Sequence, residues 1–282
     1  MEARHEMTSR AASADLIPHR AALITGASAG LGRIFAQRLA SQAYDLILVA
    51  RDAARLQTVA DELTLQYGVS VEVVAADLGR DEGMRSVAER ISKTARLAFL
   101  VNNAGFGTKG KLADRPVAEQ ATMLKLHTMA PMLLTRAALP GMIERGNGTI
   151  INVASVASFV QSAGNVNYCA TKAYLRSFSE GLALELVDTG VHVQALCPGF
   201  THTEFHERAA IEKDTVPAML WLDAERVVKE SLAQAARRGP VVCIPSVRYK
   251  LLVTLLTYLP AWFKSGVTGK YGKTRTEVVP PT

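Results

Sequence analysis

The chain has 282 residues, of which 49% are hydrophobic and 21% charged, and this composition is typical of one large globular domain. Its three cysteines, Cys169, Cys197 and Cys243, are widely spaced without a Cys-x-x-Cys pair, which argues against a thiolate metal site and indicates a reducing, cytoplasmic compartment. No apolar run reaches the ~18 residues of a membrane span, and residues 1–19 mix both charges, so we expect a flexible tail there and not a signal peptide.

The net charge of +6 is distributed unevenly along the chain. Residues 237–282 contain eight Lys or Arg and one Glu, whereas the remainder is nearly neutral. The sequence holds no RNA-recognition, zinc-finger or comparable motif, so we expect no nucleic-acid partner.

Short apolar runs rich in β-branched residues alternate along the chain with longer stretches of helical periodicity. The strand-like runs are AALITG (21–26), DLILVAR (45–51), VEVVAAD (71–77), AFLVNNAG (98–105), GTIINVAS (148–155), HVQALCPG (192–199) and VVCIP (241–245). Helical patterns include RIFAQRLASQA (33–43), AARLQTVADELTLQY (53–67) and AYLRSFSEGLALELV (173–187). This alternation predicts an α/β fold with a doubly wound sheet of about seven buried parallel strands, flanked by helices. We expect a single domain over residues 20–246.

The first of these strands runs into TGASAGLG (25–32), which opens a helix. Its three glycines let the backbone approach a pyrophosphate closely, and the helix N-terminus offers free N–H groups and a favourable dipole. A tight strand-to-helix turn also needs glycine, but the position after the first strand favours a dinucleotide site. The expected cofactor contacts in this loop are Thr25, Gly26, Ser28, Gly30, Leu31 and Gly32.

The second strand ends in VARD (49–52), where NAD-selective folds usually carry an acidic residue that binds the ribose hydroxyls. Ala50 occupies that position here, and Arg51 follows it. A guanidinium binds a phosphate through paired hydrogen bonds, so we predict NADP(H) as the cofactor, with Arg51 on the 2′-phosphate. The alternative is a solvated surface arginine.

A series of motifs resembles the short-chain dehydrogenase/reductase family over about residues 20–245. The motifs are TGASAGLG, AADL (75–78), NNAG (102–105), a serine ending the fifth strand, YCATK (168–172) and CPG (197–199). The resemblance implies a single-domain, Rossmann-type oxidoreductase that transfers hydride between a nicotinamide cofactor and a carbonyl or alcohol, commonly as a homodimer or homotetramer. It also implies further cofactor contacts: Asp77 and Leu78 at the adenine, Asn103 and Gly105 along the ribose and nicotinamide, and Pro198, Gly199, Thr201 and Thr203 over the carboxamide.

The YCATK motif places Tyr168 and Lys172 one helical turn apart on the same face. A carbonyl reductase needs an acid at the carbonyl oxygen, and a phenol with a pKa of about 10 is suitable only beside a cation that favours its ionised form. We therefore expect Tyr168 to be the general acid/base and Lys172 to tune it and bind the nicotinamide ribose. Ser155, which ends the fifth strand, would polarise the same carbonyl. A Tyr/Lys pair on a helix surface is the alternative, which the preceding INVAS makes less favoured.

One position departs from the family pattern. In this family the helix after NNAG usually carries an Asn that holds a water between the catalytic Lys and solvent, and the aligned residue here is His127, within LKLHTMAPMLL (124–134). Pro131 has no N–H, so the carbonyl of His127 lacks its usual helical donor and is expected to hold the water, with the imidazole modifying this relay. The alternative is a buried histidine with structural hydrogen bonds only.

The long segment FTHTEFHERAAIEKDTVPAMLWL (200–222) lies before a helix expected near Asp223, and we expect it to be a substrate lid. Its aromatic and apolar residues suggest a lipophilic substrate, such as a ketoacyl chain or a steroid-like ketone. The residues His202, Glu204, His206 and Glu207 could suggest a metal site, but a solvated lid face is favoured and no metal is expected.

An epimerase or dehydratase of the extended relatives is disfavoured by the glycine spacing and chain length. A cofactor-binding sensor without turnover is the competing hypothesis, motivated by the missing Asn.

The basic C-terminal extension (247–282) begins VRYKLLVTLLTYLPAWFKSGVTGKYGK. Aromatic residues with basic flanks suit a membrane interface, so peripheral contact with an anionic membrane is one hypothesis. A helix packed on the domain or on a second subunit is the simpler one. A landing site for an acidic acyl-carrier protein is the third.

Overall fold

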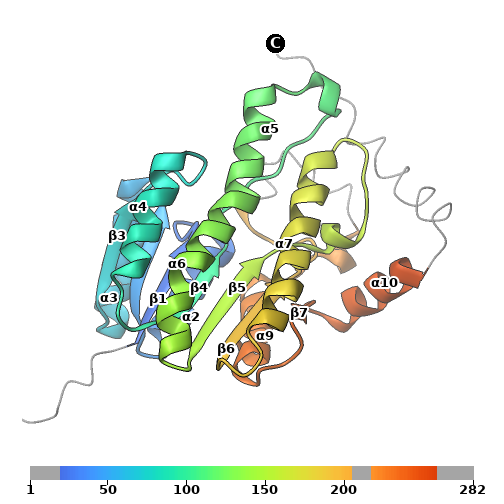
Figure 1. Ribbon diagram of the computed structural model, residues 1–282. Coiled ribbons are helices and arrows are strands. Elements are labelled where there is room, and N and C mark those ends of the chain that lie inside the picture. Colours follow the sequence, from blue (N-terminus) through green and yellow to red (C-terminus); the bar gives the residue numbers. More distant parts are fainter. Residues whose placement is uncertain (1–19, 205–216, 259–282) are drawn as a thin grey trace, which may run out of the picture.

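The computed structural model describes residues 20–204 and 217–258, and within them seven strands form one parallel sheet in the order β3-β2-β1-β4-β5-β6-β7 (Figure 1). The strands are β1 Ala21–Thr25, β2 Asp45–Ala50, β3 Val71–Ala75, β4 Leu97–Asn102, β5 Gly148–Val153, β6 Val191–Leu196 and β7 Val242–Cys243. The order reverses between β1 and β4, so a crevice is expected beyond the carboxyl ends of these two strands. The predicted doubly wound sheet is confirmed. The expected tail (1–19), the centre of the expected lid (205–216) and the end of the extension (259–282) lie outside the described residues.

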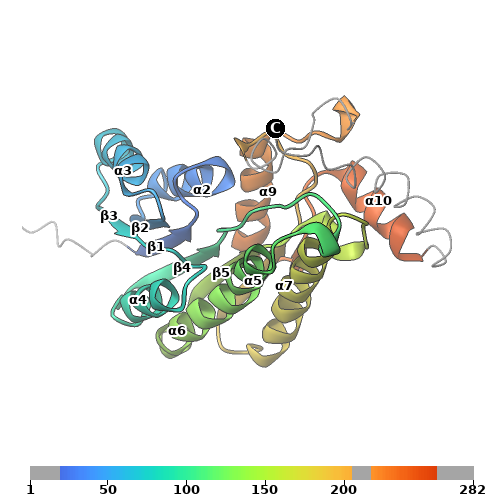
Figure 2. The same ribbon diagram turned by 90° about the horizontal axis from the view of Figure 1, so that it is seen from above.

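Helices cover both faces of the sheet, which lies between two helical layers in Figure 2. One layer holds α2 (Gly30–Ala40), α3 (Ala53–Tyr67) and α9 (Ala224–Ala236), and the other holds α4 (Asp81–Ser92), α6 (Ala130–Glu144) and α7 (Val166–Glu185). Each layer buries its apolar face in a separate core: Phe35 and Leu56 lie in the first, and Met84 and Leu134 in the second. The shorter helices are η1 (Leu112–Asp114), η3 (Val156–Phe159) and η5 (Ala218–Leu220).

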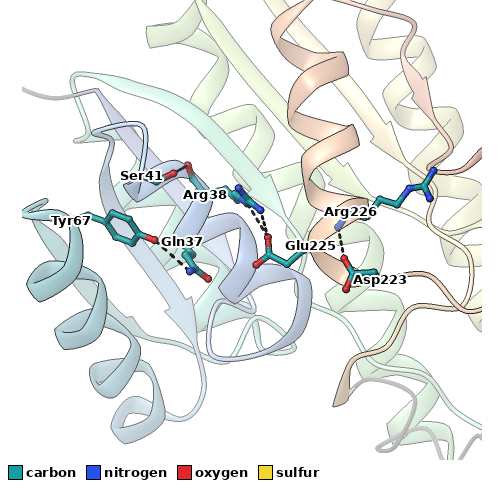
Figure 3. A network of polar contacts seen from close by, with 7 residues as sticks. All are labelled: Gln37, Arg38, Ser41, Tyr67, Asp223, Glu225 and Arg226. Atoms are coloured by element: carbon teal, nitrogen blue, oxygen red, sulfur yellow. Dashed lines mark hydrogen bonds and ion pairs between the residues drawn. The ribbon is translucent and has the colours of Figure 1, made fainter.

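Polar contacts join the helices of the first layer (Figure 3). The Arg38 guanidinium of α2 donates to Glu225 of α9 at 2.9 and 2.6 Å, and Gln37 donates to the Tyr67 hydroxyl of α3 at 3.4 Å. The Asp223 carboxylate accepts from the Arg226 N–H at 2.8 Å and caps α9, which confirms the helix start expected there. The Arg38–Glu225 pair is about two-fifths exposed, so it stabilises the fold by less than ~1 kcal/mol and mainly orients the two helices.

The strands end earlier than the apolar runs predict. β1, β4 and β5 stop at Thr25, Asn102 and Val153, so the motif residues that follow them lie in loops. β7 has two residues in place of the predicted five, because it lies between Pro240 and Pro245, which lack the N–H that a sheet requires.

The prediction of a buried strand is wrong for β3. This strand lies at the edge of the sheet, and Glu72 and Ala75 are exposed. The Arg90 guanidinium of α4 donates to both Glu72 oxygens, at 2.8 and 2.6 Å. An edge strand has a neighbour on one side only, and a paired charge facing solvent protects it from association with other strands.

One continuous helical rod leads into α6. It consists of α5 (Val117–Leu124), a π-helical turn η2 (Lys125–Met129) and α6, and the Ala130 N–H donates to the Lys125 carbonyl five residues back. The sequence did not predict this π turn, which lies just before Pro131 and contains His127. π turns shift the hydrogen-bond ladder by one residue and are frequent at functional sites.

The described part of the C-terminal extension is one helix, α10 (Val247–Tyr258), at the edge of the molecule beyond β7 (Figure 1). Tyr249 and Val253 on its inner face are buried against the domain. No helix in the described residues is long and apolar enough to cross a membrane.

Candidate active site

The turn after β1 is bonded directly to the loop after β4. The Thr25 hydroxyl accepts from the N–H groups of Asn103 and Ala104, at 2.9 and 3.0 Å, and donates to the Val101 carbonyl at 3.3 Å. In return, the Asn103 amide donates to the carbonyls of Thr25 and Gly26, at 2.9 and 3.3 Å. Two predicted cofactor segments are therefore held side by side at the reversal point of the sheet.

The glycines of this turn form a cradle in which the backbone packs closely and a side chain on Gly26 or Gly32 would have no room. Gly26 and Gly30 have φ values of +66° and +53°, and a Cβ on Gly32 would lie 2.2 Å from the Gly26 carbonyl oxygen. The N-cap of α2, Ala29, offers no side-chain hydrogen bond, so the first N–H groups of the helix have no side-chain acceptor at this end. Ser28 and Leu31 are half-buried at the same turn. A glycine cradle at a helix N-terminus whose N-cap makes no side-chain hydrogen bond fits a pyrophosphate.

The ends of β2 and β3 lie beside this cradle. Arg51 is exposed, and the neighbouring Asp52 carboxylate accepts from the Arg55 N–H at 3.0 Å and caps α3. After β3, Asp77 accepts from the Gly79 N–H at 2.9 Å, whereas the Leu78 side chain is buried in the core. The sheet thus brings the predicted adenine and 2′-phosphate contacts to the same edge.

The catalytic candidates come from α7 and from the end of β5. Lys172 is 5% exposed, its Nζ donates to the Val153 carbonyl at 2.7 Å, and the same atom lies 5.7 Å from the centroid of the Tyr168 ring. Ser155 follows Val153 by two residues, and its Oγ accepts from the Ala157 N–H at 3.1 Å. Tyr168 and Ser155 are half-buried. The end of β5 therefore presents the Ser155 hydroxyl, and one turn of α7 presents the Tyr168 phenol and the Lys172 ammonium.

Burial has a marked effect on Lys172. Removal of its ammonium from water lowers the pKa to about 8, and the nearby Cys197 acts in the opposite direction. The Cys197 thiol is itself buried, and this burial raises its pKa to about 11. At neutral pH Lys172 is still charged, so it provides a desolvated positive charge beside Tyr168.

His127 lies against the same turn of α7. It is 1% exposed, and its ring centroid is 5.9 Å from that of Tyr168. Both ring nitrogens have partners, Phe106 N–H at 3.1 Å and Thr171 Oγ1 at 3.0 Å. The π turn therefore brings His127 into contact with the loop after NNAG and with the YCATK segment.

The described start of the expected lid lies over the glycine turn. The Thr201 hydroxyl donates to the Gly199 carbonyl at 3.0 Å, and Thr201 pairs with Leu222 in a parallel bridge. A Cβ on Gly30 would lie 3.4 Å from the Thr203 side chain. Pro198 and Gly199 follow β6 directly. The start of this segment therefore lies over the glycine turn.

Of the two histidines in the expected lid, one lies within the described residues and one lies outside them. His202 stacks on Trp221, with ring centroids 4.8 Å apart, and His206 and Glu207 lie outside the described residues. Across the described ranges, no group of three or more His, Cys, Asp or Glu side chains could hold a metal ion.

Two tethers of the expected lid were not among the predicted contacts. The Arg55 guanidinium of α3 binds both carboxylate oxygens of Glu204, one of them at 2.9 Å. The Tyr249 hydroxyl of α10 accepts from the Phe200 N–H at 3.1 Å and donates to the Leu220 carbonyl at 2.7 Å, so it joins the two ends of the lid. Both tethers connect residues far apart in the chain, and no local sequence signal indicates them.

Comparison with known proteins agrees with this geometry. A profile of the short chain dehydrogenase family matches residues 20–214. The chain belongs to this family. It is therefore an oxidoreductase of the short-chain dehydrogenase type, which uses a nicotinamide cofactor.

Individual members of the family are similar over most of the chain. A 3-oxoacyl-(acyl-carrier-protein) reductase of Aquifex aeolicus is 35% identical over 66% of this chain and 75% of its own length. A very-long-chain 3-oxoacyl-CoA reductase of Anas platyrhynchos is 33% identical over 65% of this chain, which spans 60% of that longer protein. A short-chain dehydrogenase from Sphingobium yanoikuyae, solved in complex with NADPH, superposes with a TM-score of 0.77 at 33% identity and covers 93% of this chain and 98% of its own.

The role of the glycine cradle in cofactor binding can be tested by adding a methyl group to one of its glycines. We expect Gly32→Ala to weaken NADPH binding about 100-fold, because the added methyl group displaces the Gly26 carbonyl and overpacking costs about 1–3 kcal/mol. Gly181→Ala on α7 is the matched control, since its Cβ would meet nothing within 4 Å. Titration of NADPH fluorescence, with circular dichroism to check folding, gives the result. Equal affinity of the folded Gly32 variant and the control would show that the cofactor does not use this turn.

Proposed function

We propose that this member of the family is an NADP(H)-dependent carbonyl reductase, or the reverse alcohol dehydrogenase, for a lipophilic substrate. The observation that carries the proposal is the buried Lys172 ammonium, 5.7 Å from the centroid of the Tyr168 ring and with its pKa lowered to about 8. An amine held in this way beside a phenol serves proton transfer, whereas a surface Tyr/Lys pair would be solvated.

Two of the polar side chains, Ser155 and Lys172, keep hydrogens that their hydrogen bonds to the backbone do not use. The Ser155 Oγ accepts from Ala157, so its own hydrogen can be donated to a substrate carbonyl. The Lys172 ammonium gives one of its three hydrogens to Val153, which leaves two for the Tyr168 oxygen and a ribose hydroxyl. A reduced nicotinamide, when bound, would supply hydride to the carbonyl carbon. Tyr168 donates its proton to the carbonyl oxygen, and the Lys172 charge stabilises the resulting phenolate.

The sensor hypothesis is less well supported than catalysis. It was motivated by the absence of the usual Asn, but the phenol, the ammonium and the hydroxyl are all present at one edge of the sheet. A protein that only senses a cofactor has no need for a buried, desolvated lysine beside a tyrosine.

We test the reaction with Tyr168→Phe. The variant keeps the ring and loses the proton donor, so we expect unchanged NADPH affinity and a fall in kcat of at least about 100-fold, the lower range of general acid catalysis. The assay is NADPH oxidation against a panel of 3-oxoacyl esters and bulky aromatic ketones. Lys172→Ala should impair both NADPH binding and turnover. Wild-type turnover in the Phe variant would refute the assignment of Tyr168, and NADPH binding without turnover of any substrate by the wild type would support a sensor.

NADP(H) is the proposed cofactor because the end of β2 offers a cation and no free acid. Arg51 is exposed, and in the described part of the chain its guanidinium forms no hydrogen bond or ion pair. The carboxylate next in the chain, Asp52, caps α3. The solved relative from Sphingobium yanoikuyae is in complex with NADPH.

We expect Arg51→Asp to reverse this cofactor preference. Loss of a charge-assisted phosphate contact should weaken NADPH binding by about 1.5–3 kcal/mol, while a carboxylate at this position can accept from ribose hydroxyls and improve NADH binding. Dissociation constants for both cofactors give the preference, and Arg237→Asp, at an exposed position after α9, is the control for net charge. An unchanged ratio in the Arg51 variant would show that another residue selects the cofactor.

A lipophilic substrate is supported by the described ends of the lid. Phe200 and Trp221 pack with ring centroids 5.7 Å apart, and Met219 is exposed beside them. Two of the similar proteins are named as reductases of 3-oxoacyl groups. We therefore propose a 3-oxoacyl or comparably bulky ketone as the substrate class.

Peripheral membrane contact is proposed for the outer face of α10. Val247, Leu251, Leu255 and Tyr258 follow one another at helical spacing and are 60–84% exposed. The helix carries Arg248 and Lys250 and no acidic residue. An apolar stripe with basic flanks fits an anionic lipid surface, where apolar burial and charge attraction add. We further propose that this protein is cytoplasmic and that it forms a homodimer or homotetramer.

Sedimentation with lipid vesicles tests this surface. We expect the full chain to sediment with vesicles of phosphatidylglycerol and phosphatidylcholine at low salt, and to be released by high salt or by omission of phosphatidylglycerol. Leu251→Asp with Leu255→Asp should remove binding, whereas Leu65→Asp, at a 90% exposed site on α3, should not. Failure of the wild type to sediment, or equal sedimentation of all variants, would contradict lipid contact. A change of oligomer size in the double variant would instead assign the stripe to a second copy.

A further inference from the structure

His127 is a buried titratable side chain with both ring nitrogens engaged. Its Nε2 lies 3.1 Å from the Phe106 nitrogen and its Nδ1 lies 3.0 Å from Thr171 Oγ1, and the residue is 1% exposed. The two partners are on different elements: Phe106 follows the NNAG motif after β4, and Thr171 lies on α7 between Tyr168 and Lys172.

The direction of these hydrogen bonds defines the tautomer. A backbone N–H can only donate, so the Nε2 that faces Phe106 must carry a lone pair and no hydrogen. A neutral imidazole then carries its hydrogen on Nδ1. The Thr171 hydroxyl gives its own hydrogen to the Tyr168 carbonyl, at 3.0 Å, and is therefore free to accept from Nδ1. The bonds run in one direction, from Phe106 through His127 and Thr171 to Tyr168.

A charged His127 does not fit this arrangement. A second hydrogen on Nε2 would point at the Phe106 N–H, and the Lys172 ammonium on α7 acts on the ring as a like charge that opposes a charged imidazole. Burial, and then the positive charge of Lys172, hold the pKa of His127 well below its ordinary value. The loop after β4 brings Gly105, the Phe106 ring and the Phe106 N–H to the imidazole.

The approach between the loop and the ring is close. A Cβ on Gly105 would lie 2.9 Å from His127 Nε2, so the glycine of NNAG leaves the space through which the imidazole reaches the next N–H. The Phe106 ring packs against the imidazole at a centroid distance of 5.8 Å. The imidazole therefore acts as a short bridge between a predicted nicotinamide-side loop and the turn of α7 that carries the proposed acid.

We propose that His127 is a neutral positioning residue, which holds the Tyr168 turn of α7 against the loop after β4 and takes no part in proton transfer. This inference rests on the proposed function for the role of Tyr168. In this view the imidazole links two segments through hydrogen bonds. It does not gain or lose a proton during the reaction, although histidine often does so in active sites. Any water relay at this position would then use main-chain oxygen and not the ring.

The tautomer is tested by NMR on the full chain labelled with ¹⁵N-histidine. We expect His127 to show a protonated Nδ1 and an unprotonated Nε2, unchanged between about pH 8 and pH 5.5, where a solvated imidazole with a pKa of about 6.5 becomes charged. His127→Asn identifies the resonance by its loss. A hydrogen on Nε2, or a titration midpoint near 6.5, would overturn the inference, and neither result depends on the identity of the substrate.

The pH dependence of unfolding gives a second test without substrate. The unfolded chain binds a proton at His127 below pH ~6.5 and the folded chain does not, so the stability of the wild type falls as pH falls through this range. Relative to His127→Asn, the unfolding equilibrium constant of the wild type should rise by about tenfold per pH unit below 6.5 and show no relative change above it. If the unfolding equilibrium constants of the wild type and His127→Asn changed with pH in the same way over the whole range, the ring would not be neutral and buried.

The positioning role is tested at Thr171, which lies outside the reacting groups. Thr171→Val removes the acceptor of Nδ1–H and keeps the side-chain shape, so we expect kcat on a 3-oxoacyl ester to fall about tenfold while the KM for NADPH stays within twofold. Thr171→Ser keeps the hydroxyl and should restore kcat. Wild-type kcat in the Val variant, or an equal loss in the Ser variant, would refute positioning through this hydrogen bond. If no variant turns over any ester, the proposed function fails and the NMR result still decides the tautomer.

Discussion

The hydrogen bonds between Thr25 and Asn103 hold the cofactor side of the site together. They lie where the strand order reverses, and they join the end of β1 to the end of β4 through one hydroxyl and one amide. The Asn103 amide also occupies the space in which a side chain at two glycines would project, 2.8 Å from a Cβ on Gly26 and 2.6 Å from one on Gly32. The glycine turn and the NNAG loop are thus mutually adapted: each keeps its shape because the other is beside it.

The catalytic side depends on a similar junction between a strand end and a helix. Lys172 of α7 donates to the last carbonyl of β5, and Ser155 follows that strand by two residues. A movement of α7 relative to β5 would therefore displace the ammonium and the phenol relative to the hydroxyl. The site is built from short links between elements that the two cores already hold in position.

The architecture could be predicted from the sequence because strands and helices differ in period, and the repeated alternation leaves few topologies. The strand ends were placed too late, since apolar residues continue into the motifs after the ladder has stopped, as after Val153 and Leu196. The exposed edge position of β3 depends on sheet order, which a local run such as VEVVA does not contain. The motif residues of the site were found by resemblance and by chemistry, and their roles stay predictions.

The contacts that organise the site were not predictable from local pattern. Arg55 and Glu204 are 149 residues apart, Phe200 and Tyr249 are 49 apart, and His127 binds partners 21 and 44 residues away. The π turn that carries His127 is also a property of the folded rod, because Pro131 alone indicated a lost hydrogen bond and not a shift of the ladder. A side chain's partners depend on the tertiary arrangement, and no spacing within one segment contains them.

Burial of Lys172 also opposes the stability of the fold. An unfolded lysine keeps its proton to pH ~10.4, whereas the folded one loses it near pH 8. Below pH 8 both states are charged, and the folded state carries the full desolvation penalty, on the order of 3 kcal/mol. Between pH 8 and ~10.4 the unfolded state binds more protons, so the free energy of unfolding rises with pH. At neutral pH the protein is therefore less stable than its core would allow, and the charge responsible is the one that the proposed mechanism places beside Tyr168.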